Sequence, residues 1–158
     1  MQRPPEQPQT VHEVLARSYL WFLILCSAGL FFDLFFPLYI SLPHAQTLGT
    51  ILLVGAPVLI LWAQSASYRF AQERERRASV TEAMFMYGPY KFLRNPTHIG
   101  LTLLIWGYAF VTSSELLFIT TLAATLISNW YFRKHEVLLE EKYGEPYRRY
   151  RASVNTFM

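Results

Sequence analysis

The segment THIGLTLLIWGYAFVTSSELLFITTLAATLISNWYF, residues 97–132, decides the fold of this chain. It contains no lysine or arginine, and its apolar character is interrupted by the polar run Ser113-Ser114-Glu115. We interpret this run as the tight apex of a helical hairpin with two apolar arms, residues 97–112 and 116–132. At a rise of 1.5 Å per residue, each arm is shorter than the ~20 residues that usually cross a bilayer.

Three accounts of these short arms stay open: a tilted pair, a locally thinned bilayer, or helices that continue beyond the apolar run. For the second arm the pattern favours continuation, because Glu136, Leu139 and Tyr143 extend one helical face beyond Phe132. Gly144 is then expected to end this helix.

Small and acidic residues inside the apolar segments bear on helix packing. Gly100 and Gly107 on the first arm, with Ala124 and Ser128 on the second, predict small-residue faces that suit close packing. Asp33 lies well inside an apolar segment, where a carboxylate is a functional candidate by default. Its position far from the basic segments favours helix pairing or a short reach to the outer membrane interface.

Two further apolar segments precede the hairpin, at residues 19–40 and 47–66. The second contains Pro57, which a transmembrane helix tolerates when neighbouring groups satisfy the freed backbone. Beyond it, residues 68–79 are expected to stay helical, with charges of opposite sign at i,i+4 spacing. The fold class predicted is therefore an all-α integral membrane protein with about four transmembrane helices and a cytosolic C-terminal helical extension.

The distribution of charge predicts the orientation in the membrane. Of the 14 lysine and arginine residues, all but Arg3 and Arg17 fall within residues 69–94 and 133–151. The two connections expected outside, residues 41–46 and 113–115, contain none, so the positive-inside rule places both termini in the cytosol, in a cytoplasmic (inner) membrane. The net charge of +3 follows this juxtamembrane pattern and does not indicate nucleic-acid binding. The lipid bilayer is the expected partner, and the oligomeric state is open.

The polar sequence before the hairpin, residues 88–100, is the first candidate site. Pro96 suits the first position of a helix, which makes Asn95 a candidate N-cap and places Arg94 and His98 beside the helix N-terminus. The free N–H groups and positive dipole of such an end suit an anion such as a carboxylate. A capped membrane helix with a snorkelling arginine explains the same residues without a ligand.

The second candidate site is residues 133–150, after the hairpin. Pro146 restarts a short helix on which Tyr147, Tyr150 and Val154 share one side. Taken alone, this pattern predicts an amphipathic interfacial helix with its tyrosines at the level of the lipid headgroups.

Together, the two segments resemble the integral-membrane methyltransferases, a superfamily that includes isoprenylcysteine carboxyl methyltransferase and the phospholipid N-methyltransferases. The resemblance lies in the order Gly-Pro-Tyr, Arg-x-Pro, a short apolar hairpin, then Glu-x-x-Leu-x-x-x-aromatic-Gly-x-x-Tyr-x-x-Tyr, and it covers residues 88–154. It implies S-adenosylmethionine as methyl donor, bound in a cytosol-facing pocket between the Arg-x-Pro helix start and the post-hairpin helix. It also implies a lipophilic small-molecule acceptor that enters from the bilayer.

Carried over by position, the resemblance names the site residues and three departures. Asn95 replaces the histidine of the family's Arg-His-Pro, His98 replaces a tyrosine, and His135 replaces the first of two paired glutamates, of which Glu136 is kept. A neutral asparagine can still donate a hydrogen bond to a cofactor carboxylate. The resemblance implies two catalytic residues, Arg94 and His98, and these cofactor-binding residues: Tyr90, Asn95, Pro96, His98, Gly100, His135, Glu136 and Tyr147.

The acceptor could be a carboxylate, an amine or a thiol. A carboxylate needs only orientation, by Arg94, whereas an amine or thiol must lose a proton, for which His98 is the best general-base candidate. Two other functions stay open. An NADPH-dependent membrane reductase of the steroid-reductase type shares the Arg-x-Pro start but commonly carries an acidic residue where this chain has Leu101. A non-enzymatic membrane adaptor with a degenerate pocket is the other. The scattered histidines do not predict a metal site.

The domain organisation expected is simple. Residues 1–16 are polar and proline-rich, and predict a flexible tail with no signal-peptide pattern. Residues 17–158 predict a single membrane methyltransferase domain, with its catalytic core at about residues 80–154.

Overall fold

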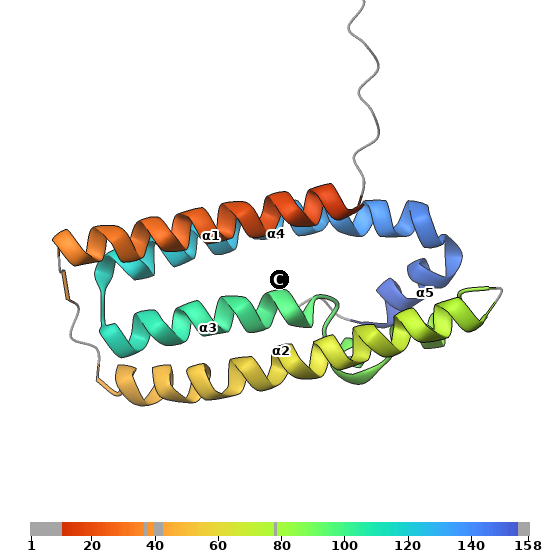
Figure 1. Cartoon of the computed structure of the whole chain (residues 1–158), viewed down its shortest axis with the longest axis horizontal. Helices are drawn as coiled ribbons and strands as arrows, with labels where there is room; N and C mark the ends of the chain where they lie inside the picture. Colours follow the sequence, from red (N-terminus) through yellow and green to blue (C-terminus); the bar gives the residue numbers. More distant parts are fainter. Residues whose placement is uncertain (1–10, 37, 40–42, 78, 155–158) are drawn as a thin grey trace, which may run out of the picture.

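The computed structural model describes residues 11–36, 38–39, 43–77 and 79–154, with the side chains of residues 11–18 excepted, and within this part of the chain the regular structure is helical. Five α-helices and two short 3-10 helices follow one another along the chain (Figure 1). They are α1 (Val11–Phe35), α2 (Ala45–Arg76), η1 (Glu82–Phe85), η2 (Gly88–Lys91), α3 (Pro96–Thr112), α4 (Glu115–Tyr143) and α5 (Glu145–Ser153). The all-α class predicted from the sequence is confirmed for these residues.

The four long helices run side by side as two pairs, in which α2 packs mainly against α3 and α1 mainly against α4 (Figure 1). The α2–α3 pair is held close by glycines. A Cβ atom on Gly49 would lie 2.6 Å from the Gly107 carbonyl oxygen, and one on Gly100 would lie 2.5 Å from an Ile60 side-chain carbon. The predicted small-residue face of α3 is therefore confirmed, and α2 is its partner.

The α1–α4 pair is also packed through small residues, at Gly29 and Ala124. A Cβ atom on Gly29 would collide with the side chain of Thr120, and Ala124 is fully buried against Phe22 and Cys26. The connection between α3 and α4 is the tight apex expected from the sequence. Ser113 has a left-handed backbone, and the hydroxyl of Ser114 accepts a hydrogen bond from the amide of Leu117.

Asp33, near the end of α1, accepts a hydrogen bond from the Ser114 hydroxyl. The backbone beside it makes a second tie, because the Glu115 amide donates to the Leu38 carbonyl over 2.9 Å. The carboxylate inside the apolar segment thus pairs α1 with the start of α4, which confirms helix pairing as its role.

Three helix ends differ from those expected. α1 begins at Val11, within the predicted tail of residues 1–16 and before the apolar segment predicted at residues 19–40, and it ends at Phe35. Residues 37 and 40–42 and the part of the predicted tail at residues 1–10 lie outside the described residues. α2 runs without a break through Pro57, as expected, but ends at Arg76, where the extended backbone of Arg77 ends the helix before residue 79.

α4 continues to Tyr143, well beyond the apolar run, which confirms the continuation predicted for this arm. Gly144 ends it with a positive φ of 63°, and its amide donates to the Glu140 carbonyl over 2.8 Å. The two basic blocks consequently lie at the same end of the bundle, around the C-terminal ends of α2 and α4, the start of α3, and α5 (Figure 1). We call this the basic end, and the end with the Ser113–Ser114 apex the apical end.

Large apolar side chains are exposed along α1, α2 and α4, among them Phe31, Leu61 and Leu126. Among the described helices, α2 is the one that is both long and apolar enough to cross a membrane by itself, and the apolar part of α1, Tyr19–Phe35, is shorter. Length and composition therefore support one of the four predicted transmembrane helices, α2.

Candidate functional site

A cavity of about 250 Å³ opens at the basic end, slightly smaller than the ~300–1,000 Å³ typical of ligand pockets. Six elements contribute to its wall besides the N-terminal part of α1. Half of the lining residues are phenylalanine or tyrosine, and the polar ones include Arg94 and Asn95 just before α3, His98 on α3 and His135 on α4. The lining residues are Tyr19, Ala66, Ser67, Phe70, Met84, Phe85, Tyr87, Tyr90, Arg94, Asn95, Thr97, His98, Phe132, His135, Leu139, Tyr143, Tyr147 and Tyr150.

The N-terminus of α3 forms one side of this cavity. Asn95 occupies the N-cap position, and its carbonyl accepts from the Ile99 amide over 3.1 Å, but its side chain makes no capping hydrogen bond. Asn95 lines the cavity, and its side chain is not used to cap the helix. The positive end of the α3 dipole, at the first backbone amides, therefore lies at the cavity wall.

His98, one turn into α3, is 3% exposed and lies between two aromatic rings. Its ring centroid is 4.1 Å from that of Phe132 and 5.9 Å from that of Phe22. Neither ring nitrogen has a hydrogen-bond partner among the described residues. A buried imidazole without a partner is costly, and such groups usually serve a ligand or a reaction.

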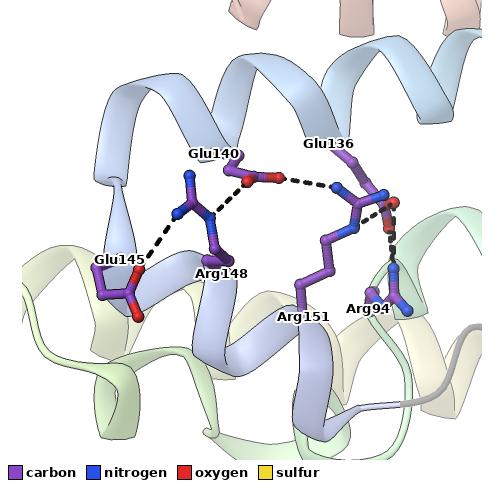
Figure 2. Close-up of polar contacts among 6 residues, drawn as sticks. All are labelled: Arg94, Glu136, Glu140, Glu145, Arg148 and Arg151. Atoms are coloured by element: carbon purple, nitrogen blue, oxygen red, sulfur yellow. Dashed lines mark hydrogen bonds and ion pairs between the residues drawn. The ribbon is translucent and has the colours of Figure 1, made fainter.

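Arg94 precedes the α3 N-terminus and is held by two contacts. Its Nε donates to the Val154 carbonyl over 2.9 Å, and its Nη1 lies 3.1 and 3.2 Å from the two carboxylate oxygens of Glu136 (Figure 2). Both side chains are largely buried, at 14% exposed for Arg94 and 9% for Glu136. The guanidinium is thus fixed against α4 and the end of α5 while it lines the cavity.

Glu136 belongs to a larger network that fastens α5 to α4. Arg151 lies 3.6 Å from a Glu136 oxygen and 2.8 Å from a Glu140 oxygen, so it bridges two carboxylates one turn apart (Figure 2). Arg148 lies 2.8 Å from the other Glu140 oxygen. The hydrogen bonds from Arg148 and then Arg151 lower the pKa of the Glu140 carboxyl below its usual value.

α5 packs its aromatic face onto the body of the protein. Tyr147 and Tyr150 are 3% and 2% exposed, and together with Val154 they contact Phe85 of η1 and Leu139 of α4. Burial raises the pKa of both tyrosines. The interfacial arrangement expected for this helix is wrong, because its tyrosines line the cavity and are not available to lipid headgroups.

η2 forms part of the cavity wall and contains the predicted Gly-Pro turn. Gly88 has a positive φ of 56°, which a side chain disfavours, and it brings Tyr90 over α2. The Tyr90 hydroxyl is hydrogen-bonded to the Ser67 hydroxyl over 2.8 Å, and its carbonyl accepts from the Tyr150 hydroxyl over 2.9 Å. Tyr90 therefore ties α2 and α5 together across the cavity.

Six of the residues named from the sequence line this cavity, and three do not. The six are Tyr90, Arg94, Asn95, His98, His135 and Tyr147. Pro96 is buried in the first turn of α3, Gly100 packs against α2, and Glu136 faces Arg94. The roles of all nine toward a cofactor stay predictions.

Sequence reasoning missed most of the aromatic wall. Tyr19, Phe70, Phe85 and Phe132 come from four elements, and none belongs to a motif that marks a site. Only the aromatic richness of the chain, 16% of its residues, hinted at such a wall. Among the lining residues Arg94 carries the one permanent charge, and the wall contains no aspartate or glutamate.

Comparison with known proteins gives one result. The family model described as phospholipid methyltransferase matches residues 44–146, well over half of the 158 residues. No curated protein and no solved structure gives a significant match. The matched residues supply every lining residue of the cavity except Tyr19, Tyr147 and Tyr150. This chain belongs to the phospholipid methyltransferase family, and methyl transfer at a membrane is the activity that this membership supports.

Proposed function

We propose that this protein transfers a methyl group from S-adenosylmethionine to a lipophilic acceptor at the cytosolic face of a membrane, with both substrates meeting in the cavity at the basic end. The observation that carries the proposal is that the family match supplies nearly all of the cavity wall. The region that defines the family and the region that can hold a small molecule are therefore the same.

The membrane placement follows from where apolar and basic residues lie. Exposed apolar side chains extend along three helices, among them Leu23 of α1, Val58 of α2 and Ile119 of α4. Contiguous exposed apolar surface of this kind is rare on soluble proteins and is usual where lipid is the solvent. With the basic end in the cytosol, the four long helices span the membrane, and the apical end faces outward.

The residues present fit the cofactor. Its carboxylate suits the start of α3, where Arg94, the Asn95 side chain and the helix N-terminus offer positive charge and hydrogen-bond donors. Its sulfonium cation and adenine suit the aromatic wall, including Tyr143 and Tyr147, through cation–π contact and stacking. Glu136 acts in this arrangement through Arg94, which it holds in place.

When bound, the cofactor supplies an electrophilic methyl group, and the residues of the chain prepare the acceptor. His98 is buried at the cavity wall with both ring nitrogens available to a ligand. A neutral imidazole in this position can take the proton of an amine or thiol acceptor, leaving its lone pair on the attacking atom. A carboxylate acceptor needs no such step, and its orientation would rest on Arg94.

The test is binding and turnover of the purified protein in nanodiscs of defined lipid. We expect S-adenosylhomocysteine to bind by calorimetry, and methyl-tritiated S-adenosylmethionine to label material extracted into organic solvent. Binding of NADPH in place of S-adenosylhomocysteine would instead indicate a reductase. Binding of neither nucleotide, by folded protein, would contradict the proposal in favour of an adaptor.

A further inference from the structure

One carboxylate, that of Glu136, lies between two guanidinium groups from different parts of the chain. Arg94 comes from the segment before α3, and Arg151 from the last turn of α5. Arg151 also pairs with Glu140, so two guanidinium groups face two carboxylates in this cluster. Glu136 therefore fixes Arg94 through a carboxylate that it shares with Arg151.

Arg151 also fixes the end of α5. It bridges Glu136 and Glu140, two acidic side chains one turn apart on α4 that would otherwise repel each other. Three residues further on, the Val154 carbonyl accepts from Arg94 Nε. The hydrogen bond from Arg94 to Val154 thus depends on the end of α5, which Arg151 holds against α4.

The geometry of Arg94 leaves one part of it for a ligand. Nε donates to the Val154 carbonyl and Nη1 donates to Glu136, whereas Nη2 takes no part in these bonds. An arginine held at two of its three nitrogens presents the third, Nη2, in a fixed direction, which suits an anionic group such as a carboxylate.

We propose that Arg151 is a positioning residue for ligand binding: by sharing Glu136 with Arg94 and fastening the Val154 carbonyl, it orients Arg94 toward the anionic group of a ligand in the cavity. The ligand class is a molecule with a carboxylate, and the identification of that ligand as the methyl donor rests on the proposed function. Arg151 itself lies outside the cavity wall and touches no ligand.

The neighbouring Arg149 provides a matched control. It lies on the same helix and is 67% exposed, and its ion pair is with Glu145, four residues before it on the chain, over 3.2 Å. Arg149→Gln removes the same charge from α5 without touching Glu136 or Val154. Arg151→Lys keeps the charge but can reach only one carboxylate well.

Two measurements on the full chain in detergent test the proposal. In ligand-free protein with ¹⁵N-labelled arginine, the Nε–H of Arg94, assigned by its absence in Arg94→Lys, should exchange slowly in the wild type and in Arg149→Gln. It should exchange rapidly in Arg151→Gln. By calorimetry, Arg151→Gln should weaken S-adenosylhomocysteine binding about fivefold, the size expected for a partly exposed charge contact, with Arg151→Lys between it and the wild type.

The outcomes separate this proposal from the proposed function. If the wild type binds S-adenosylhomocysteine while Arg151→Gln keeps both slow exchange and wild-type affinity, the positioning role is overturned and the function stands. If no form of the protein binds S-adenosylhomocysteine, the function is overturned, and rapid Nε–H exchange in Arg151→Gln alone still supports the positioning of Arg94. Rapid exchange with unchanged affinity would overturn the link between Arg151 and the ligand.

Discussion

The two ends of the α3–α4 hairpin use similar polar groups for different purposes. At the apical end, Asp33 accepts from Ser114, and the Ser114 hydroxyl also caps α4. At the basic end, Glu136 holds Arg94, but Asn95 and His98 nearby are left facing a cavity. One end satisfies its polar groups within the protein, and the other leaves some of them for a ligand.

The difference follows from how the helices separate. At the apical end α3 and α4 are joined by two serines, so the helix ends are satisfied locally. Beyond this turn, α3 packs mainly on α2 and α4 packs mainly on α1. The aromatic residues of η1 and α5 enclose the space between them, so a polar group there faces a cavity. Ligand chemistry is therefore expected at one end of the hairpin only.

The largest expected effect is at the Arg94–Glu136 pair. Arg94→Ala and Glu136→Ala should each reduce S-adenosylhomocysteine binding and methyl transfer to below detection. Removal of one partner leaves the other buried charge unpaired, at a cost of about 3–5 kcal/mol in stability, and it removes or releases the guanidinium expected to bind the cofactor carboxylate. Calorimetry in detergent checks the binding, and Lys91→Ala, an exposed change nearby, should be silent. Unchanged cofactor affinity in both variants would refute this site.

His98→Gln is expected to have the next largest effect. If the imidazole takes a proton from an amine or thiol acceptor, kcat should fall about a hundredfold, the lower part of the usual range for a general base. S-adenosylhomocysteine affinity should change by less than about threefold, since a neutral donor and acceptor remain. Thr102→Val, one turn along α3 and equally buried, is the matched control. A loss in affinity with kcat intact would assign His98 to the cofactor and not to the acceptor.

Local patterns were enough to predict the ends of the hairpin. The chain turns at Ser113-Ser114-Glu115, as this polar run predicted. Pro96 begins α3 and Gly144 ends α4, also as predicted. The pairing of helices was not accessible in the same way. The two arms of a hairpin are expected to pack together, yet α3 packs mainly on α2, where Gly49 and Gly107 allow the backbones to approach, and α4 packs mainly on α1.

The cavity itself depends on contacts between distant residues. The resemblance to the membrane methyltransferases identified Arg94 and Glu136 separately, but a sequence does not tell whether opposite charges 42 residues apart face a ligand or each other. The structure pairs them. Likewise, the period of α5 predicted an apolar side correctly, while the choice between lipid and Phe85 as its neighbour was made by tertiary packing.

A stability test of the helix pairing uses two glycines of α2. Gly49→Ala places a Cβ 2.6 Å from the Gly107 carbonyl oxygen and 2.7 Å from the Val111 amide nitrogen, both backbone atoms that cannot move alone. We expect a loss of about 1–3 kcal/mol, the usual range for overpacking. Gly55→Ala, with open space around it, should be neutral or slightly stabilising because alanine favours helix. Equal thermal stability of the two variants would refute the close α2–α3 contact.

A smaller effect is expected at the apical end. Asp33→Ala should cost about 1–2 kcal/mol, because the Ser114 hydroxyl loses a charged acceptor but keeps its capping contact with α4. Cofactor affinity should stay at the wild-type value, since the ligand site is at the other end of the bundle. Thermal unfolding and calorimetry on the same preparation check both parts. A change in affinity larger than the change in stability would mean that the two ends are coupled.

The smallest effect concerns pH and the network beneath α5. Arg148 and Arg151 lower the pKa of the Glu140 carboxyl, so this group contributes stability above its unfolded pKa, and the contribution is lost as pH falls through the lowered folded value. Glu140→Gln should therefore be less stable than the wild type at neutral pH, with a gap that closes as the pH drops below about 4.5, the ordinary value for this group. Glu141→Gln, an exposed change beside it, should show no such gap. If the Glu140 gap persisted at low pH, the contribution would come from packing and not from charge. Because Arg151 also holds Glu136, acid that releases Glu140 should disturb the basic end before it disturbs the apical end, where the Asp33–Ser114 contact lies apart from this network.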